Sequence, residues 1–298
     1  MKILLLGKNG QVGWELQRSL APLGEVLELD RHSTHYCGDL SMPEQLAQTV
    51  LAYKPDFIVN AAAHTAVDKA ESEPELSKLV NTDAPAALAK AAAQVGAWLV
   101  HYSTDYVFDG RGTHARQEGE GTGPLSVYGQ TKLDGEKSIV TSGCKYLIFR
   151  TSWVYATRGA NFAKTMLRLA QERDKLTVID DQYGAPTGAD LIADVTAHAM
   201  RHVLNTQNSS LSGVYHLVAS GETTWHGYAS HVIEQAKRMC PVLDWKVADV
   251  AAVPTTAFPT PASRPLNSRL CTTKVQKAFG LVLPPWQQGV DRMLAEIL

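Results

Sequence analysis

Residues 3–13 read ILLLGKNGQVG, and this stretch decides the fold class of the chain. The four apolar residues that open it predict a buried strand, and 13–20 has the apolar spacing of a helix. Gly7, Gly10 and Gly13 form the turn between them. Glycines at such a turn let the backbone approach a pyrophosphate, whose charge then lies at the helix N-terminus. The stretch therefore predicts the first strand, turn and helix of a dinucleotide-binding unit.

The same alternation of strand and helix continues through the first half of the chain. Short apolar runs predict strands, and longer segments rich in helix formers predict helices. The expected strands are 25–29, 57–59, 98–102 and 146–149, and the expected helices are 43–51, 84–95 and 131–140. Strands that are apolar on both faces indicate a parallel sheet covered by helices on both sides. The predicted fold is α/β, a Rossmann-type doubly wound parallel sheet with a smaller C-terminal α/β substrate domain.

The alternation weakens in the second half, which sets the expected domain boundaries. We expect a dinucleotide-binding domain at 1–152, with segments at about 190–220 returning to it, and a mainly substrate-binding domain at 153–298. Proline and threonine crowd into 253–265, which excludes a helix or a central strand there. That segment is either a linker or an ordered loop that covers a ligand.

Bulk composition is that of an ordinary globular protein. Of the 298 residues, 45% are hydrophobic and 19% charged, and the formal net charge is −2. This charge does not favour nucleic acid or a membrane as a partner. No uncharged run approaches the ~20 residues needed to cross a bilayer. The four cysteines contain no C-x-x-C pair, so we expect no zinc site, no disulfide framework and a cytoplasmic location.

Two charged residues bear on the choice of dinucleotide. The second expected strand ends at Asp30, where an acidic side chain binds the ribose hydroxyls of an adenosine. A carboxylate there repels a 2′-phosphate and favours NADH, but the adjacent Arg31 can accommodate that phosphate. Both NADH and NADPH remain candidate cofactors.

Three residues form the predicted catalytic group. Tyr128 and Lys132 are four positions apart, so they share one face of a helix. An ammonium at that distance is expected to lower the pKa of the phenol, which then protonates a developing alkoxide as hydride arrives. Thr104 follows the fourth strand, at the sheet edge where ligands bind, and is expected to hold the substrate oxygen.

These motifs together resemble the extended short-chain dehydrogenases, and within them the dTDP-4-dehydrorhamnose reductases. The resemblance covers essentially the whole chain. It is carried by the spacing G-x-x-G-x-x-G and by segments 60–71, 101–108, 150–155, 180–187 and 264–268. It implies that NADPH or NADH reduces the 4-keto group of dTDP-4-dehydro-6-deoxy-L-mannose to dTDP-L-rhamnose. Related dehydratases carry a glutamate where this chain has Tyr106, which favours a reductase.

The resemblance also implies binding residues. For the cofactor these are Gly7, Asn9, Gly10, Gln11, Val12, Gly13, Asp30, Arg31, Asp39, Leu40, Ala62, Ala63, Thr65, Tyr128 and Lys132, with Asp39 and Leu40 following a further short strand. For the dTDP-sugar they are Thr65, Val67, Thr104, Asp105, Tyr106, Trp153, Asn161, Gln182 and Arg264. Trp153 is expected to stack on the sugar, and Arg264 to pair with its diphosphate.

Partners and alternatives complete these expectations. The family implies a homodimer, and it has been associated with Mg²⁺ at the subunit contact, here near Glu15 and Asp190. Surface carboxylates without a metal are the alternative interpretation. Two other functions stay open. One is another nucleotide-sugar reductase or epimerase. The other is a non-catalytic regulatory subunit, as in methionine adenosyltransferase, although a regulatory subunit has no need of a complete Thr104, Tyr128 and Lys132 set.

Overall fold

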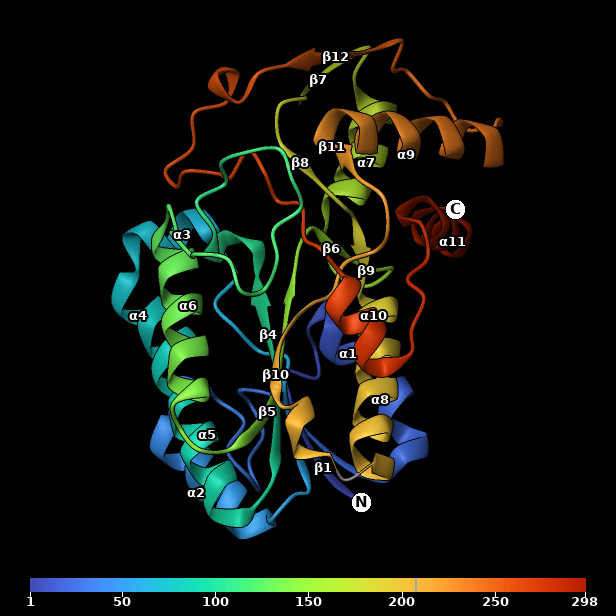
Figure 1. Ribbon diagram of the computed structural model, residues 1–298. Coiled ribbons are helices and arrows are strands. Elements are labelled where there is room, and N and C mark those ends of the chain that lie inside the picture. The colour runs from blue at the N-terminus through green and yellow to red at the C-terminus, as the bar shows by residue number, and fades with distance from the viewer. Residues whose placement is uncertain (207) are drawn as a thin grey trace.

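The computed structural model describes residues 1–206 and 208–298. Six parallel strands form the main sheet, in the spatial order β10-β5-β4-β3-β1-β2. Their bounds are β1 Lys2–Leu6, β2 Glu25–Leu29, β3 Phe57–Asn60, β4 Trp98–Thr104, β5 Lys145–Thr151 and β10 Gly213–His216. Figure 1 shows helices on both sides of this sheet. The predicted Rossmann-type doubly wound fold is therefore confirmed.

Strand β1 shows why the sheet forms. Ile3 and Leu5 point to one face and pack against α1 (Gln11–Leu20) and α8 (Ala189–Thr206). Leu4 and Leu6 point to the other face, against α2 (Pro43–Tyr53) and α5 (Ala84–Val95). All four side chains are fully buried. A continuous apolar run is thus the pattern of a strand covered on both faces.

The order of the strands fixes where a ligand can bind. β2 lies on one side of β1 and β3 on the other, so the direction of winding reverses at β1. In open α/β sheets the ligand cleft lies outside the carboxyl ends of the strands at that point. α6 (Val127–Val140) packs beside α5 on the same face of the sheet.

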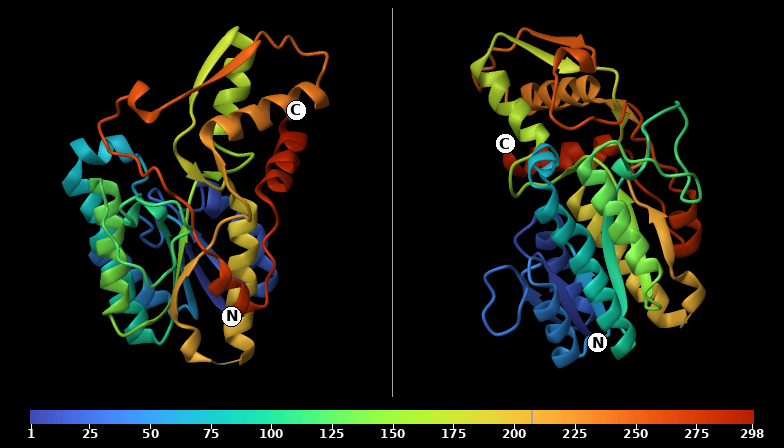
Figure 2. Two further views of the ribbon diagram at one scale, coloured as in Figure 1. Left: turned by 45° about the horizontal axis from the view of Figure 1, so that its top comes forward. Right: turned by 90° about the vertical axis from the view of Figure 1, so that its left-hand side faces the viewer.

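A smaller α/β part lies beyond the carboxyl ends of the sheet (Figures 1 and 2). It has three two-stranded pairings: β7 (Lys175–Ile179) with β12 (Asp249–Val253), β8 (Tyr183–Gly184) with β11 (Thr223–Thr224), and β6 (Val154–Tyr155) with β9 (Thr187–Gly188). Its helices are α7 (Phe162–Glu172), α9 (Trp225–Met239) and α11 (Trp286–Ile297), around a separate apolar core. The remaining helices and short helical turns are α3 Val67–Ser72, α4 Pro74–Lys78, α10 Thr273–Phe279, η1 Ala21–Leu23, η2 Leu79–Asp83, η3 Asp105–Val107, η4 Ser209–Leu211 and η5 Thr255–Ala257.

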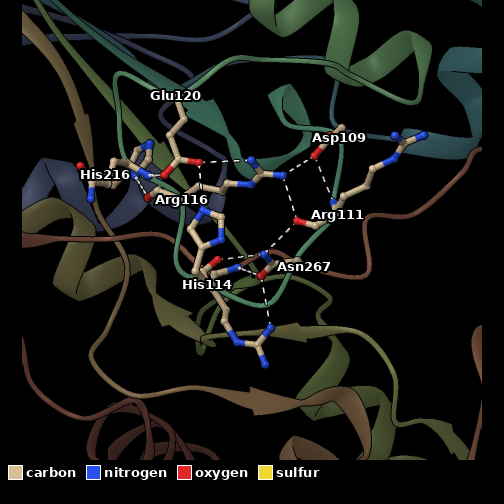
Figure 3. Close-up of polar contacts among 9 residues, drawn as sticks. Asp109, Arg111, His114, Arg116, Glu120, His216 and Asn267 are labelled. Carbon is tan, nitrogen blue, oxygen red and sulfur yellow. Dashed lines mark hydrogen bonds and ion pairs between the residues drawn. The ribbon is translucent and has the colours of Figure 1, made fainter.

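Two long segments are ordered by hydrogen bonds to other parts of the chain. The proline-rich segment 253–265 begins in β12, and the Arg264 guanidinium donates to Asp68 Oδ2 at 2.7 Å. It is therefore an ordered loop. Figure 3 shows the second segment, a loop in which Arg116 binds Asp109 and Glu120.

The loop that contains Arg116 also pairs with the chain after 264. Asn267 Nδ2 donates to the carbonyl of His114 at 2.9 Å, and the amide of Arg116 donates to the carbonyl of Arg269 at 2.9 Å. Both contacts hold a loop of the sheet domain against the C-terminal segment. Within the described residues, no helix is both long enough and apolar enough to cross a membrane.

Candidate active site

A cavity of about 1020 Å³ lies at the carboxyl edge of the sheet. It is lined by the turn after β1, the ends of β2 to β5, the start of α6 and one residue of α9. Among the residues predicted from the sequence, it collects Gly7, Asn9, Gly10, Gln11, Val12, Asp30, Arg31, Asp39, Leu40, Ala62, Ala63, Thr65, Val67, Thr104, Asp105, Tyr106, Tyr128, Lys132 and Trp153. Gly13, Asn161, Gln182 and Arg264 do not line it. The volume is that of a site for a large ligand.

The glycine turn at one end of the cavity has the geometry of a phosphate cradle. Gly7 has a φ of 87°, and a Cβ there would lie 2.8 Å from the amide nitrogen of Ala62. Gly10 precedes α1 and has no side chain that could cap the helix. The first N–H groups of α1, at the edge of the cavity, therefore have no capping side chain as an acceptor. Gly13 packs inward, since a Cβ there would lie 2.0 Å from the carbonyl oxygen of Gly7. Gly13 therefore allows α1 to pack closely on the glycine turn.

Asp30 and Arg31 lie side by side at the adjacent rim of the cavity. Asn9 Nδ2 donates to Asp30 Oδ2 at 2.5 Å, and the amide of His32 donates to Asp30 Oδ1 at 2.8 Å. The bond from His32 holds the pKa of Asp30 below its usual value. The carboxylate is therefore ionised at neutral pH. No strand forms between β2 and α2, so the short strand expected before Asp39 is absent and this residue lies in a loop.

Thr104, Tyr128 and Lys132 converge at the other end of the cavity. Thr104 ends β4, where its hydroxyl accepts from the amide of Tyr106 at 3.2 Å and donates to Asp105 Oδ1 at 3.1 Å. The expectation that Lys132 lowers the pKa of Tyr128 is wrong for this structure. Burial raises that pKa to about 12, and only the hydrogen bond with Thr104 opposes the shift. Tyr128 is therefore a phenol at neutral pH, which is the form that gives a proton.

Lys132 is almost entirely enclosed, with 2% of its surface exposed. Its ammonium nitrogen donates to the carbonyl of Tyr102 at 2.6 Å and lies 3.1 Å from His101 Nε2. Burial lowers the pKa of Lys132 to about 8, against the effect of the Glu136 carboxylate. Buried ionisable groups with a shifted pKa cluster at functional sites.

Two stacked tryptophans close the far wall of the cavity. Trp153 and Trp225 have ring centroids 3.8 Å apart and planes 18° apart. Trp153 has a φ of 48°, which is rare for a side chain of this size. Gly184 lies behind it, since a Cβ there would come 2.8 Å from the indole. An aromatic wall in the same cavity as Thr104 and Tyr128 is suited to stacking against a sugar ring.

Three predicted substrate residues are held by protein partners instead. Asn161 caps α7 and donates to the carbonyl of Ala156 at 2.7 Å. The amide of Gln182 bridges Trp225 Nε1 and Thr255 Oγ1, and Arg264 pairs with Asp68. These contacts fix the three side chains, while Arg264 Nη1 keeps no partner among residues 1–206 and 208–298.

The sequence matches the family model for the RmlD substrate binding domain over residues 1–298. The dTDP-4-dehydrorhamnose reductase of Escherichia coli (strain K12) is 61% identical over 297 residues, covering 100% of this chain and 98% of that protein. The chain belongs to the dTDP-4-dehydrorhamnose reductase family. The resemblance expected from its motifs is confirmed.

Solved structures of this family agree with the fold. The dTDP-4-dehydrorhamnose reductase from Clostridium acetobutylicum ATCC 824 matches with a TM-score of 0.88 and 33% identity, covering 100% of this chain and 99% of that one. The enzyme from Bacillus anthracis str. Ames, in complex with NADP, matches with a TM-score of 0.87 and 33% identity, covering 99% of each chain.

The residues that the family implies for Mg²⁺ do share a second, small cavity of about 40 Å³. Glu15 lies 3.6 Å from Arg18 Nε, and Asp190 lies 3.8 Å from Arg292 Nη1. Across residues 1–206 and 208–298, no three His, Cys, Asp or Glu side chains come together as metal ligands. Both arginines also bind a second carboxylate at shorter distance, Arg18 with Asp194 at 2.9 Å and Arg292 with Glu296 at 3.2 Å. Nothing in the arrangement supports a magnesium site.

Sequence reasoning missed residues that the fold brings to the site. Trp225 comes from α9, far along the chain, and only its position after a Thr-Thr cap marks it as the start of a helix. Asn60 and His101 stood inside quoted family segments but were assigned no role. They pair in register on β3 and β4, directly behind Lys132. Nothing local in the sequence shows that contact.

Proposed function

We propose that this protein reduces the 4-keto group of dTDP-4-dehydro-6-deoxy-L-mannose to give dTDP-L-rhamnose, with NADPH or NADH as hydride donor and Tyr128 as proton donor. The observation that carries this proposal is the convergence of Thr104, Tyr128 and Lys132 in one cavity with the glycine cradle. The relatives named above support the substrate, and the Bacillus anthracis structure supports a nicotinamide dinucleotide.

The residues of the cavity divide between the two ligands. The turn around Gly10 and the N-terminus of α1 fit a pyrophosphate, while Asp30 and Arg31 fit the adenosine ribose beside it. A bound nicotinamide supplies hydride to the keto carbon. Lys132 stands where it can hold the ribose of that ring. This assignment places the reacting carbonyl between Thr104 and Tyr128.

Proton transfer follows from the state of Tyr128. Hydride addition leaves negative charge on the substrate oxygen, which a hydrogen bond from Thr104 stabilises. Because burial keeps Tyr128 as a phenol, its O–H is available to protonate that oxygen. The resulting phenolate then regains a proton from solvent by way of the neighbouring polar groups. Hydride at carbon and a proton at oxygen complete the reduction.

Substrate binding is proposed for the wall opposite the cofactor. Thr65, Val67 and Tyr106 line it, and the Trp153 indole offers an aromatic face to the sugar. Asp105 lies beneath Thr104 and is 2% exposed. Contacts from Asn161, Gln182 and Arg264 to the dTDP group, the homodimer and the cytoplasmic location stay predictions.

Isotope transfer separates this function from its competitors. The protein is incubated with reduced cofactor carrying deuterium at the transferred position and with the keto-sugar, and the product is analysed by NMR. Reduction predicts one deuterium at carbon 4 of a 6-deoxyhexose and one equivalent of oxidised cofactor. An epimerase gives no net cofactor oxidation, and a regulatory subunit gives no product although it binds the cofactor.

A further inference from the structure

Three buried side chains form a line at the inner wall of the cavity, from β3 through β4 to α6. Asn60 Nδ2 lies 3.2 Å from His101 Nδ1, and His101 Nε2 lies 3.1 Å from Lys132 Nζ. Their exposed fractions are 1%, 1% and 2%. At such low exposure each polar atom depends on its neighbours for hydrogen bonds.

The amide of Asn60 is oriented by the backbone. Its Oδ1 accepts a hydrogen bond from the amide of Ala62 at 3.2 Å, so its Nδ2 faces His101. An amide nitrogen can only donate, and His101 Nδ1 must therefore accept. Burial lowers the pKa of His101 well below its usual value, so the ring is neutral and carries one proton. That proton is on Nε2, the nitrogen that faces Lys132.

This arrangement bears on the protonation of Lys132. An amine can donate to the carbonyl of Tyr102 and accept from His101 Nε2–H with its lone pair. An ammonium has no lone pair, so in the charged state the two N–H groups oppose each other. Protonation of Lys132 therefore requires the proton on the His101 ring to move from Nε2 to Nδ1. This move breaks the hydrogen bond between Asn60 and His101.

We propose that Asn60 and His101 are positioning residues that act through Lys132, fixing its side-chain nitrogen beside Tyr102 and weakening its hold on a proton. The inference rests on the proposed role of Lys132. An ammonium that gives up its proton readily is a suitable source for the Tyr128 phenolate formed in each turnover: the N–H bond breaks, the phenol O–H forms, and the amine is recharged from solvent. Efficient proton exchange needs a group that titrates near the working pH.

Other charged groups around Lys132 do not account for this effect. On α6, Glu136 favours the ammonium, but β5 supplies Arg150, which binds that carboxylate at 2.7 Å. Glu71 of α3 accepts from the amide of Val127 at the start of α6. Four further titratable side chains of the surrounding elements line the cavity: Tyr128 on α6, Tyr102 on β4, whose phenol bonds to Thr196, and Asp105 and Tyr106 on η3. Lys132 donates to the backbone carbonyl of Tyr102, and none of these four side chains accepts a hydrogen bond from it.

The direct test reads the tautomer of His101 by NMR of ¹⁵N-histidine-labelled protein, without substrate. We expect the wild-type ring to be neutral with its proton on Nε2 at a pH above the pKa of Lys132, about 8, where that side chain is an amine. The variant Asn60→Asp places an acceptor opposite Nδ1, and we expect the proton to move to Nδ1 there. A wild-type ring protonated on Nδ1 at that pH, or an unchanged tautomer in the folded variant, would overturn the proposal. The wild-type spectrum decides the question even if the variant fails to fold.

Kinetics supply the second readout. In Asn60→Asp, Lys132 keeps its proton to higher pH, so the alkaline limb of kcat/KM should move up by about one pH unit. Asn81→Asp is the matched control, because Asn81 is equally buried and contacts α6 at Thr131 but does not touch His101. Its pH limb should stay in place; an equal shift in both variants would contradict the proposal. Failure of the proposed reaction would leave the tautomer result intact, so the two failures are distinguishable.

Discussion

Trp153 lies against Trp225 with ring centroids 3.8 Å apart and planes only 18° from parallel. The two residues come from different parts of the chain, one after β5 and the other at the start of α9. The left-handed backbone at Trp153 costs on the order of 1–3 kcal/mol, and it persists because its surroundings hold it. Trp225 is one of those surroundings, and Gln182 in turn holds Trp225.

Truncating Trp225 should therefore weaken sugar binding without stopping chemistry. Trp225→Ala is expected to raise the KM for the keto-sugar about 2- to 10-fold, the value of an aromatic contact, with kcat little changed. Trp225→Phe should recover most of the loss. Steady-state kinetics at saturating cofactor measure both. As control, Trp14→Ala removes an exposed tryptophan outside the cavity and should leave KM unchanged; an equal effect there would remove the argument for the stack.

Asp30 should set the preference between the two cofactors. Its ionised carboxylate repels a 2′-phosphate, so Asp30→Ala should raise the ratio of NADPH to NADH use roughly 10-fold. Arg31→Ala should move the same ratio in the opposite direction. The ratio of kcat/KM values for the two cofactors is the measurement. A ratio unchanged in both variants would show that the adenosine ribose does not bind beside these residues.

Gly7 should tolerate no side chain. In Gly7→Ala the new Cβ meets the backbone of Ala62 at 2.8 Å and the backbone has a φ of 87°, so both the fold and the cradle are strained. We expect a loss of at least about 1 kcal/mol in the free energy of unfolding, and loss of cofactor affinity. Gly119→Ala is the control, since nothing lies within 4 Å of its added Cβ. Denaturant unfolding and cofactor titration measure the two effects.

Asp105 should make stability depend on pH. Burial raises its pKa to about 6, so the folded state binds a proton more tightly than the unfolded state. Its contribution is fully present below the unfolded pKa of ~4 and is lost as the pH rises through about 6. The loss amounts to roughly 3 kcal/mol. Unfolding of wild type and Asp105→Asn from pH 4 to pH 7 should show wild type losing stability relative to the variant; parallel curves would contradict the shift.

The sequence predicted those features of the structure that leave a local pattern in the residues. The run at 3–6 and the turn glycines were enough to place the first strand and the cradle, because burial on both faces and a tight turn each leave a local pattern. The strand expected before Asp39 did not form, and that pattern was borrowed from resemblance. Trp225 and His101 were missed because their roles arise from contacts between distant segments.

Chemical environment was harder to predict than position. Spacing on the helix correctly placed Tyr128 and Lys132 in one cavity, but it could not show how deeply they are buried. Burial, and not the neighbouring ammonium, dominates the pKa of Tyr128. In the same way, Gln182 and Arg264 have the right chemistry for a ligand but are already bound to Trp225 and Asp68.

The most direct test of the central claim compares wild type with Tyr128→Phe. Oxidation of reduced cofactor is measured with dTDP-4-dehydro-6-deoxy-L-mannose, and cofactor affinity is measured separately by titration. The proposed mechanism predicts turnover by wild type, a loss of at least about 100-fold in kcat for Tyr128→Phe, and cofactor affinity within a few-fold of wild type. Turnover retained by Tyr128→Phe would contradict the assignment of the proton donor.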